Sequence, residues 1–215
     1  MHPQLLIFDL DGTLLNTVAD LATAVNLMRA QYGLAAIPED LVAEYVGDGM
    51  RMLVSRALQG FPADVDEALR FHAAFYRLHL HDRTQPYPGV VEGLPELQRC
   101  GHTLALATNK SIEATEALLR HFGLREHFCS VMGGGSGPKL KPDPDMLLTI
   151  MRDVGASPVA TWMVGDHHTD MEAARRAGCR SAFLAYGIGN LGDEQATGTF
   201  ADFADFVRAF GPGAA

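Results

Sequence analysis

The sequence predicts an α/β protein: a Rossmann-like parallel sheet with helices on both faces, plus an inserted all-helical cap domain. Two observations support this fold class. From residue 86 onward, short apolar segments alternate with helical segments, whereas residues 17–83 show helical spacing throughout. Alternating strands and helices are typical of a parallel sheet that is buried on both faces. The chain has 215 residues, of which 47% are hydrophobic, and this is enough for a packed core that carries a sizeable insertion.

The first part of the chain contains one strand and then only helices. Residues 4–8 form a short apolar segment that predicts a buried strand, and the polar residues 9–13 predict a turn. Apolar residues then recur at helical spacing, and four helix-breaking residues divide this stretch into pieces: Gly33, Pro38, Gly60 and Pro62. We therefore expect a helical cap domain over residues 17–84 and a core domain formed by residues 1–16 and 85–215.

The second part of the chain predicts the rest of the sheet. Apolar segments predict strands over residues 103–107, 128–132, 161–164 and 181–186. Amphipathic segments predict helices over residues 90–99, 112–122, 144–154, 171–177 and 203–210. A helix therefore precedes each of these strands, which is the order that a parallel sheet requires.

The composition argues against several kinds of partner. The formal net charge of −9 disfavours nucleic acid, because proteins that bind nucleic acids carry basic patches. No basic run or long apolar segment suits a membrane, and the first residues lack the features of a signal peptide. The three cysteines form no CxxC pair, which fits reduced thiols. We expect a cytoplasmic monomer or homodimer with no membrane or nucleic-acid partner.

Polar residues follow four of the predicted strands. The carboxyl ends of parallel strands face one crevice, where ligands bind. Each group alone has a structural explanation, such as a turn or a helix cap, but four groups at the same ends of four strands predict a shared site. In strand order they are Asp9 and Asp11, then Thr108, Asn109 and Lys110, then Lys139 and Lys141, then Asp166 and Asp170.

The clustered aspartates predict a hard cation and phosphate chemistry. Two like charges about 4 Å apart repel by about 4 kcal/mol at an effective dielectric constant of about 20, and a phosphate would add to this repulsion. Mg²⁺ prefers oxygen ligands and binds phosphates together with carboxylates. One carboxylate can then act as nucleophile and a second as general acid and base, while lysine, threonine and asparagine stabilise the transferred group.

Four segments of the chain resemble the four motifs of the haloacid dehalogenase-like (HAD) superfamily, in the same order. They are Phe8-Asp9-Leu10-Asp11-Gly12-Thr13, Thr108-Asn109, Lys141-Pro142-Asp143-Pro144 and Gly165-Asp166-His167-His168-Thr169-Asp170. The match extends through almost the whole chain. The resemblance implies a Mg²⁺-dependent phosphatase that hydrolyses small phosphate monoesters through a phospho-aspartyl intermediate.

The resemblance implies a role for the residues of the first three motifs. Asp9 would be the nucleophile, and Asp11 would be the general acid and base. Thr108 and Asn109 would bind the phosphoryl group. Lys141, directly before a proline, would neutralise the charge of that group.

The resemblance also implies a set of metal ligands. The Asp9 side chain, the Asp11 backbone carbonyl and Asp166 would bind Mg²⁺. Asp170 would not bind the metal directly but would orient Lys141 or a metal-bound water.

A segment of the expected cap resembles the corresponding segment of phosphoglycolate phosphatases. It runs from residue 46 to residue 58. Gly47 and Gly49 allow the backbone to approach a ligand, and Arg51 would pair with a substrate carboxylate. We therefore take 2-phosphoglycolate as the favoured substrate.

Three alternatives stay open: a sugar-phosphate mutase, a pyrophosphatase and a non-catalytic binding module. In the mutases that the chain resembles, a histidine on the first cap helix assists acid-base chemistry, and Leu21 stands at the matching position. Thr13 replaces the valine that is usual in those mutases. A binding module would be expected to have lost Asp9, Asp11 or other motif residues, all of which are present.

Several other signals are interpreted as structural. The GxGxxG pattern at residues 187–192 is followed by too little chain for a dinucleotide fold, so we expect a loop that can border the site. Lys110 and Lys139 fall outside the motifs, and we interpret both as solvated loop lysines. His72 and His79 are expected on a cap helix and its end.

Overall fold

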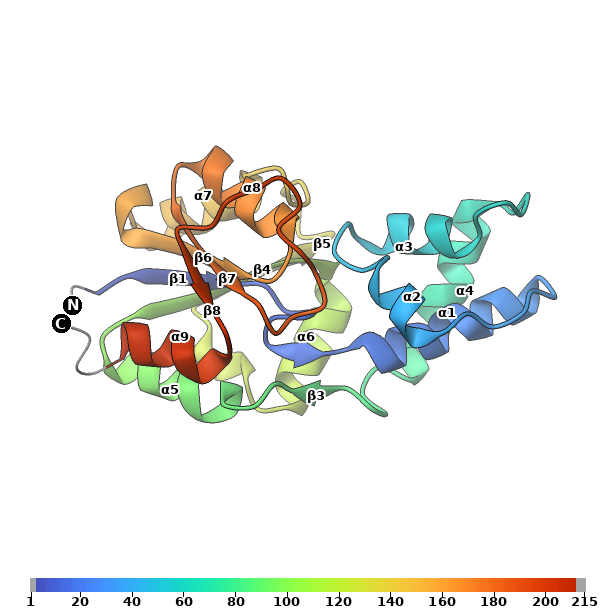
Figure 1. Ribbon diagram of the computed structural model, residues 1–215, viewed down its shortest axis with the longest axis horizontal. Helices are drawn as coiled ribbons and strands as arrows, with labels where there is room; N and C mark the ends of the chain where they lie inside the picture. Colours follow the sequence, from blue (N-terminus) through green and yellow to red (C-terminus); the bar gives the residue numbers. More distant parts are fainter. Residues whose placement is uncertain (1–2, 212–215) are drawn as a thin grey trace.

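The computed structural model describes residues 3–211, and its centre is a six-stranded sheet (Figure 1). The strand order is β5-β4-β1-β6-β7-β8, and all neighbours are parallel. The predicted parallel sheet is therefore confirmed. Its strands are β1 (Leu5–Phe8), β4 (Thr103–Ser111), β5 (Ser130–Gly134), β6 (Thr161–Gly165), β7 (Arg180–Leu184) and β8 (Gly198–Phe200).

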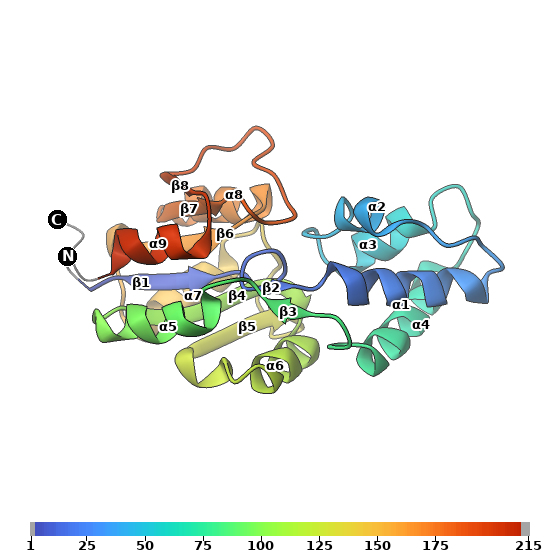
Figure 2. The same ribbon diagram turned by 60° about the horizontal axis from the view of Figure 1, so that its bottom comes forward.

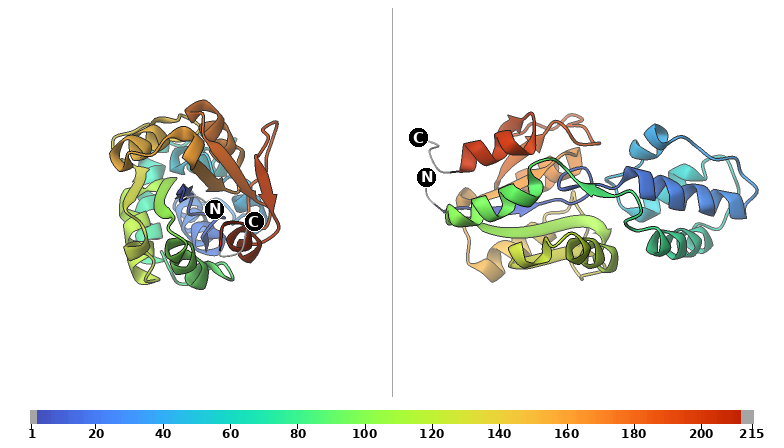
Figure 3. Two further views of the ribbon diagram at one scale, coloured as in Figure 1. Left: turned by 90° about the vertical axis from the view of Figure 1, so that its left-hand side faces the viewer. Right: turned by 90° about the horizontal axis from the view of Figure 1, so that it is seen from below.

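Alternate residues of β1 pack against two different layers of helices. Leu5 and Ile7 belong to a hydrophobic cluster with residues of α7 and α8. Leu6 and Phe8 belong to a second cluster with residues of α5, α6 and α9. The view along the strands shows the sheet between these layers (Figure 3, left). The helices are α5 (Val90–Arg99), α6 (Ile112–His121), α7 (Asp145–Val154), α8 (His168–Ala177) and α9 (Phe203–Phe210).

Four further helices form an insertion between β2 and β3: α1 (Val18–Gln31), α2 (Glu39–Ala43), α3 (Met50–Ala57) and α4 (Val65–Leu78). They lie beyond the carboxyl ends of the sheet strands (Figures 1 and 2). The chain enters and leaves this insertion through an antiparallel pair, β2 (Leu15–Asn16) and β3 (Gln85–Pro86). The division into separate domains at residues 16/17 and 84/85 stays a prediction.

A buried carboxylate ties the two ends of the insertion together. Asp20, near the start of α1, accepts hydrogen bonds from the backbone N–H groups of Arg83 and Thr84 and from the Thr84 hydroxyl, at 2.7–3.0 Å. Asp20 is 1% exposed and Thr84 is fully buried. These bonds hold the start of α1 against the segment that returns to the core.

Replacing Asp20 with Ala is expected to lower the free energy of unfolding by about 2–4 kcal/mol, because several buried donors would lose a charged acceptor. Urea unfolding of both proteins measures this difference. Asp153→Ala, at an exposed position of α7, is the matched control and is expected to stay within about 0.5 kcal/mol of the parent. A similar small effect for the Asp20 variant would contradict the role of this carboxylate.

The structure adds short elements that the pattern did not predict. Strands β2, β3 and β8 have only two or three residues each, and such short strands show no detectable periodicity in the sequence. Strand β4 extends beyond the predicted residues 103–107, because Ser111 pairs with Gly134 after a shift in register. Within residues 3–211, every helix is too short or too polar to cross a lipid bilayer.

Candidate active site

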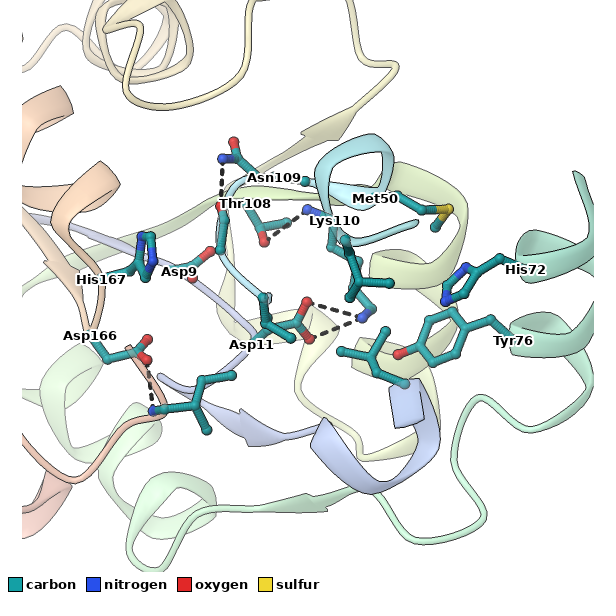
Figure 4. Close-up of a pocket in the computed structure, with 16 residues that line it drawn as sticks. Asp9, Asp11, Met50, His72, Tyr76, Thr108, Asn109, Lys110, Asp166 and His167 are labelled. Carbon is teal, nitrogen blue, oxygen red and sulfur yellow. Dashed lines mark hydrogen bonds and ion pairs between the residues drawn. The ribbon is translucent and has the colours of Figure 1, made fainter. Parts of the chain in front are cut away.

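A pocket lies where the carboxyl ends of β1, β4 and β6 meet the helical insertion (Figure 4). Strands β4 and β5 lie on one side of β1 and the later strands on the other, so this is the switch point at which open α/β sheets bind ligands. The pocket has an empty volume of about 590 Å³. The core side contributes Asp9, Asp11, Thr108, Asn109, Lys110, Asp166, His167 and Ile188, and the insertion contributes Leu21, Val46, Gly47, Gly49, Met50, Leu53, His72 and Tyr76.

Lys141 joins two carboxylates beside the pocket. Its Nζ lies 2.8 Å from Oδ1 of Asp9 and 2.6 Å from Oδ1 of Asp170. Burial by itself lowers the pKa of Lys141, but the carboxylates of Asp170 and Asp9 outweigh burial and raise the pKa above its usual value. Lys141 is therefore a permanent cation next to Asp9, and it also contacts Asp170. The role of Asp170 in orienting Lys141 or a metal-bound water stays a prediction.

Asp166 is fixed by three hydrogen bonds at the end of β6. One of its carboxylate oxygens accepts from the Thr13 hydroxyl at 2.7 Å. The other accepts from the backbone N–H groups of Ile188 and Gly189, both at 3.0 Å. The loop that we expected to border the site does so, and it binds a carboxylate with its backbone. Burial, together with two neighbouring carboxylates, raises the pKa of Asp166 to about 7.

Two glycines of the motifs are required by close packing around these carboxylates. Gly12 has φ +84°, and a Cβ there would lie 2.2 Å from Oδ2 of Asp166. A Cβ at Gly165 would lie 2.2 Å from Oδ2 of Asp170. Heavy atoms cannot approach so closely, so any side chain at either position would displace a carboxylate of the site.

The acidic residues fit a divalent cation. Carboxylate oxygens of Asp9, Asp166 and Asp170 lie within 4.8 Å of one another, and all three residues are buried. Together with Asp11, these residues bring four carboxylates to a site that holds two lysine ammonium groups. Two formal negative charges therefore lack a counter-ion in a buried place, where uncompensated charge is costly. An all-oxygen donor set with this charge suits Mg²⁺.

The position of Lys110 corrects our interpretation of this residue as a solvated loop lysine. Its side chain is 3% exposed, and its Nζ lies 2.9 and 3.0 Å from the two carboxylate oxygens of Asp11. The Thr17 hydroxyl also donates to Asp11, at 2.7 Å. Strand β4 continues through these residues, and residues two apart in a strand share a face, which places Lys110 beside Thr108.

The two residues of the second motif differ in what they contact. Thr108 is buried in the pocket wall, and its hydroxyl accepts a hydrogen bond from the backbone N–H of Lys110 at 3.3 Å. The Asn109 amide donates to the backbone carbonyls of Gly47 and Lys141 and accepts from the Lys141 N–H, each at 2.8 Å. The Asn109 side chain therefore positions Lys141 and the insertion loop, and only Thr108 has its side chain available to a phosphoryl group.

The structure does not bring Arg51 to the pocket. Its side chain is 63% exposed and forms an ion pair with Asp66 of α4. Its neighbour Met50 lines the pocket instead, because adjacent residues of a helix point about 100° apart. The expected pairing of Arg51 with a substrate carboxylate therefore has no support in this arrangement.

His72 and Tyr76 are pocket residues that the sequence did not identify as functional. They lie one helical turn apart on α4, as expected for His72, and both are buried. Figure 4 shows both rings directed toward the ammonium group of Lys110. A spacing of four residues places both side chains on one face of a helix, but it does not show whether that face turns toward the core.

Replacing His72 with Gln is expected to flatten the dependence of stability on pH. Burial, aided by the charge of Lys110, lowers the pKa of His72 to about 4 from an ordinary 6.5. Because the folded pKa is below the unfolded one, the stability due to neutral His72 is complete above about pH 6.5 and falls as the pH drops toward 4. This loss amounts to about 3 kcal/mol.

Urea unfolding at several pH values between 6.5 and 4 measures this effect. His121→Gln, at an exposed position of α6, is the matched control and should keep the parental slope. An unchanged slope in the His72 variant would contradict the assignment of His72 as a buried neutral histidine.

Aspartates gather at the carboxyl ends of parallel strands in this fold, and the chain belongs to the haloacid dehalogenase-like hydrolase family, whose model matches residues 6–184. The resemblance of the four motifs to this superfamily is thereby confirmed.

Relatives and solved structures are similar over nearly the full chain. Phosphoglycolate phosphatase of Chromobacterium violaceum is 37% identical, and the match covers 96% of this chain and 97% of the relative. Phosphoglycolate phosphatase of Psychrobacter arcticus is 38% identical, with 96% and 95% covered. The crystal structure of a predicted phosphoglycolate phosphatase from Haemophilus somnus is 31% identical and superposes with a TM-score of 0.90, covering 96% of this chain and 97% of that one.

Proposed function

We propose that this protein is a Mg²⁺-dependent phosphatase that hydrolyses small phosphate monoesters through a phospho-aspartyl intermediate on Asp9. The observation that carries the proposal is the arrangement around Asp9. A buried lysine pairs with this carboxylate at 2.8 Å, and oxygens of Asp166 and Asp170 lie within 4.8 Å of it. A nucleophilic carboxylate beside a fixed cation and further carboxylates is suited to phosphoryl transfer.

In the first step, an Asp9 oxygen attacks the phosphorus atom and the bond from phosphorus to the ester oxygen breaks. Asp11, which must be protonated when the substrate binds, gives its proton to the departing alkoxide, and Lys141 and the Thr108 hydroxyl stabilise the charge on the transferred group. In the second step, Asp11 takes a proton from a water molecule that attacks the phosphoryl group, which releases phosphate and restores Asp9. Bound Mg²⁺, held by Asp9, Asp166 and the Asp11 carbonyl, would reduce the repulsion between carboxylates and phosphate.

In this proposal the helical insertion acts as a cap that covers the active site. Residues 46, 47, 49 and 50 and the buried face of α4 lie over the strand ends, so the insertion excludes water from the site. We propose 2-phosphoglycolate as the favoured substrate, because the relatives that match the chain over nearly its full length are phosphoglycolate phosphatases. The mutase alternative is less favoured, since the apolar side chain of Leu21 lines the pocket and cannot transfer protons.

Phosphate release from a panel of esters, with Mg²⁺ and with EDTA, tests this proposal. The panel includes 2-phosphoglycolate, sugar phosphates, nucleotides and pyrophosphate. We expect metal-dependent release with 2-phosphoglycolate ahead of the others. If another ester is hydrolysed faster than 2-phosphoglycolate, the proposed reaction stands but 2-phosphoglycolate is rejected as the favoured substrate. No release from any compound would reject the hydrolase, and transfer of phosphate between sugar phosphates would then be measured.

We also propose a cytoplasmic location. Cys100, Cys129 and Cys179 are all free thiols in the structure, and reduced cysteines are usual in that compartment. Cell fractionation with detection of the protein tests this, and recovery from a secreted or membrane fraction would reject it.

A further inference from the structure

One wall of the pocket carries polar side chains that the proposed reaction does not use. His72 and Tyr76 of α4 and Lys110 of β4 are all buried, and all three line the pocket that contains Asp9 and Asp11 (Figure 4). The Lys110 ammonium group lies 4.5 Å from the centre of the Tyr76 ring. The other residues that the insertion contributes to the pocket are apolar and include Leu21, so charges here are poorly screened.

Three polar atoms of this wall lack a partner within the described part of the chain. Both ring nitrogens of His72 and the hydroxyl of Tyr76 are buried and make no hydrogen bond to residues 3–211. Buried polar groups without a partner are rare and costly. Their position in a pocket indicates that a bound ligand satisfies them.

The charge of Lys110 indicates which chemical group the ligand presents to this wall. Its ammonium group has three donors and already contacts the Asp11 carboxylate. When Asp11 carries the proton for the leaving group, the charge of Lys110 is no longer paired, and an anion beside it is favoured over a neutral hydroxyl. In the proposed reaction the phosphoryl group is bound at Asp9, and Figure 4 shows Asp11 between Asp9 and Lys110. The anion at Lys110 is therefore on the part of the substrate that leaves.

We propose that Lys110, Tyr76 and His72 form a binding site for a carboxylate on the leaving group of the substrate. This inference rests on the proposed function, and it assigns the residues that would bind the carboxylate of 2-phosphoglycolate. The Lys110 ammonium group and the Tyr76 hydroxyl donate to the carboxylate, and the protonated ring nitrogen of neutral His72 supplies a further donor. Lys110 thereby takes the place that the sequence suggested for Arg51.

Binding of two matched phosphonates, measured by titration calorimetry with Mg²⁺ present, tests the site. 3-Phosphonopropionate has the shape of 2-phosphoglycolate but cannot be hydrolysed, and propylphosphonate has a methyl group in place of the carboxylate. We expect the parent protein to prefer 3-phosphonopropionate by about 10- to 100-fold, the range for a hydrogen-bonded charge. Lys110→Met should remove this preference, and Tyr76→Phe should lower it by about fivefold or more.

Matched controls separate this effect from general damage. Lys139→Met removes a lysine that is 74% exposed, and Tyr32→Phe removes a hydroxyl that contacts the exposed Glu67. Both should keep the parental ratio of affinities. Where Lys110→Met fails to fold, Tyr76→Phe carries the test, because it removes a single oxygen.

The outcomes separate this inference from the proposed function. Equal affinity of the parent for the two phosphonates, or an unchanged ratio in Tyr76→Phe and Lys110→Met, would overturn the carboxylate site even if phosphate esters are hydrolysed. A preference that depends on Lys110 and Tyr76 in a protein that hydrolyses nothing would support the site and reject the phosphatase.

Discussion

Replacing Asp9 with Asn is expected to lower kcat by about a thousandfold or more, because an amide cannot replace the nucleophilic carboxylate. The fold should survive. Asp9 shares Lys141 with Asp170, so the lysine keeps one ionised partner, and the loss of one charge relieves repulsion with Asp166. Thermal unfolding should therefore change by only a few degrees, as for other mild substitutions.

Steady-state phosphate release and thermal unfolding are measured on the same protein samples. Asp153→Asn, at an exposed position of α7, is the matched control and should have parental activity. Turnover at the parental rate by the Asp9 variant would remove Asp9 from the role of nucleophile. If the Asp9→Asn variant does not fold, Asp9→Glu takes its place in the test. This variant keeps the negative charge but moves the attacking oxygen, so it should also be inactive.

Removing divalent cations with EDTA is expected to reduce turnover to background, and Mg²⁺ is expected to restore it. The physical reason is the excess of negative charge at Asp9, Asp11, Asp166 and Asp170, which repels a phosphate dianion until a cation is bound. Mg²⁺ at about 100 times its dissociation constant would also stabilise the folded protein by about 2.7 kcal/mol. In a chain of this size such a gain raises the unfolding temperature by about 5–10 °C.

Asp166→Asn separates a specific metal site from a general effect of salt. This variant should lose both the activation by Mg²⁺ and the rise in unfolding temperature, whereas Asp145→Asn, on the surface of α7, should keep both. Full activity after thorough chelation, or an equal thermal response in the two variants, would contradict the proposed metal site.

Most of the fold was predictable because its determinants are local. The four apolar residues of β1 are buried on both faces, and the segments that alternate after them have the period of strands and helices. The carboxyl ends of β1, β4 and β6 then had to meet, and this brings Asp9, Thr108 and Asp166 together in the structure. Short elements such as β8 depend on tertiary contacts and leave no periodic signal.

The wall formed by the insertion was not predictable in the same way. His72 and Tyr76 share one face of α4, but the side toward which that face turns depends on how α4 packs on the other helices. Arg51 illustrates the same limit. Its place in the sequence suggested a contact with a substrate carboxylate, but the orientation of α3 about its axis directs the side chain to Asp66. Lys110 would have been placed beside Thr108 by strand alternation only if the strand had been predicted to continue beyond residue 107, as β4 does.

The side-chain amide of Asn109 contacts both the insertion and the segment that carries Lys141. One hydrogen bond reaches the insertion loop at Gly47, and two others hold the backbone of Lys141. If the insertion swings away to admit a substrate, only the bond to Gly47 is broken, and the bonds to Lys141 persist. The cation beside the nucleophile would then stay in place through every opening and closing. The core would remain preorganised for reaction throughout the cycle, and only the access route would be rebuilt at each turnover.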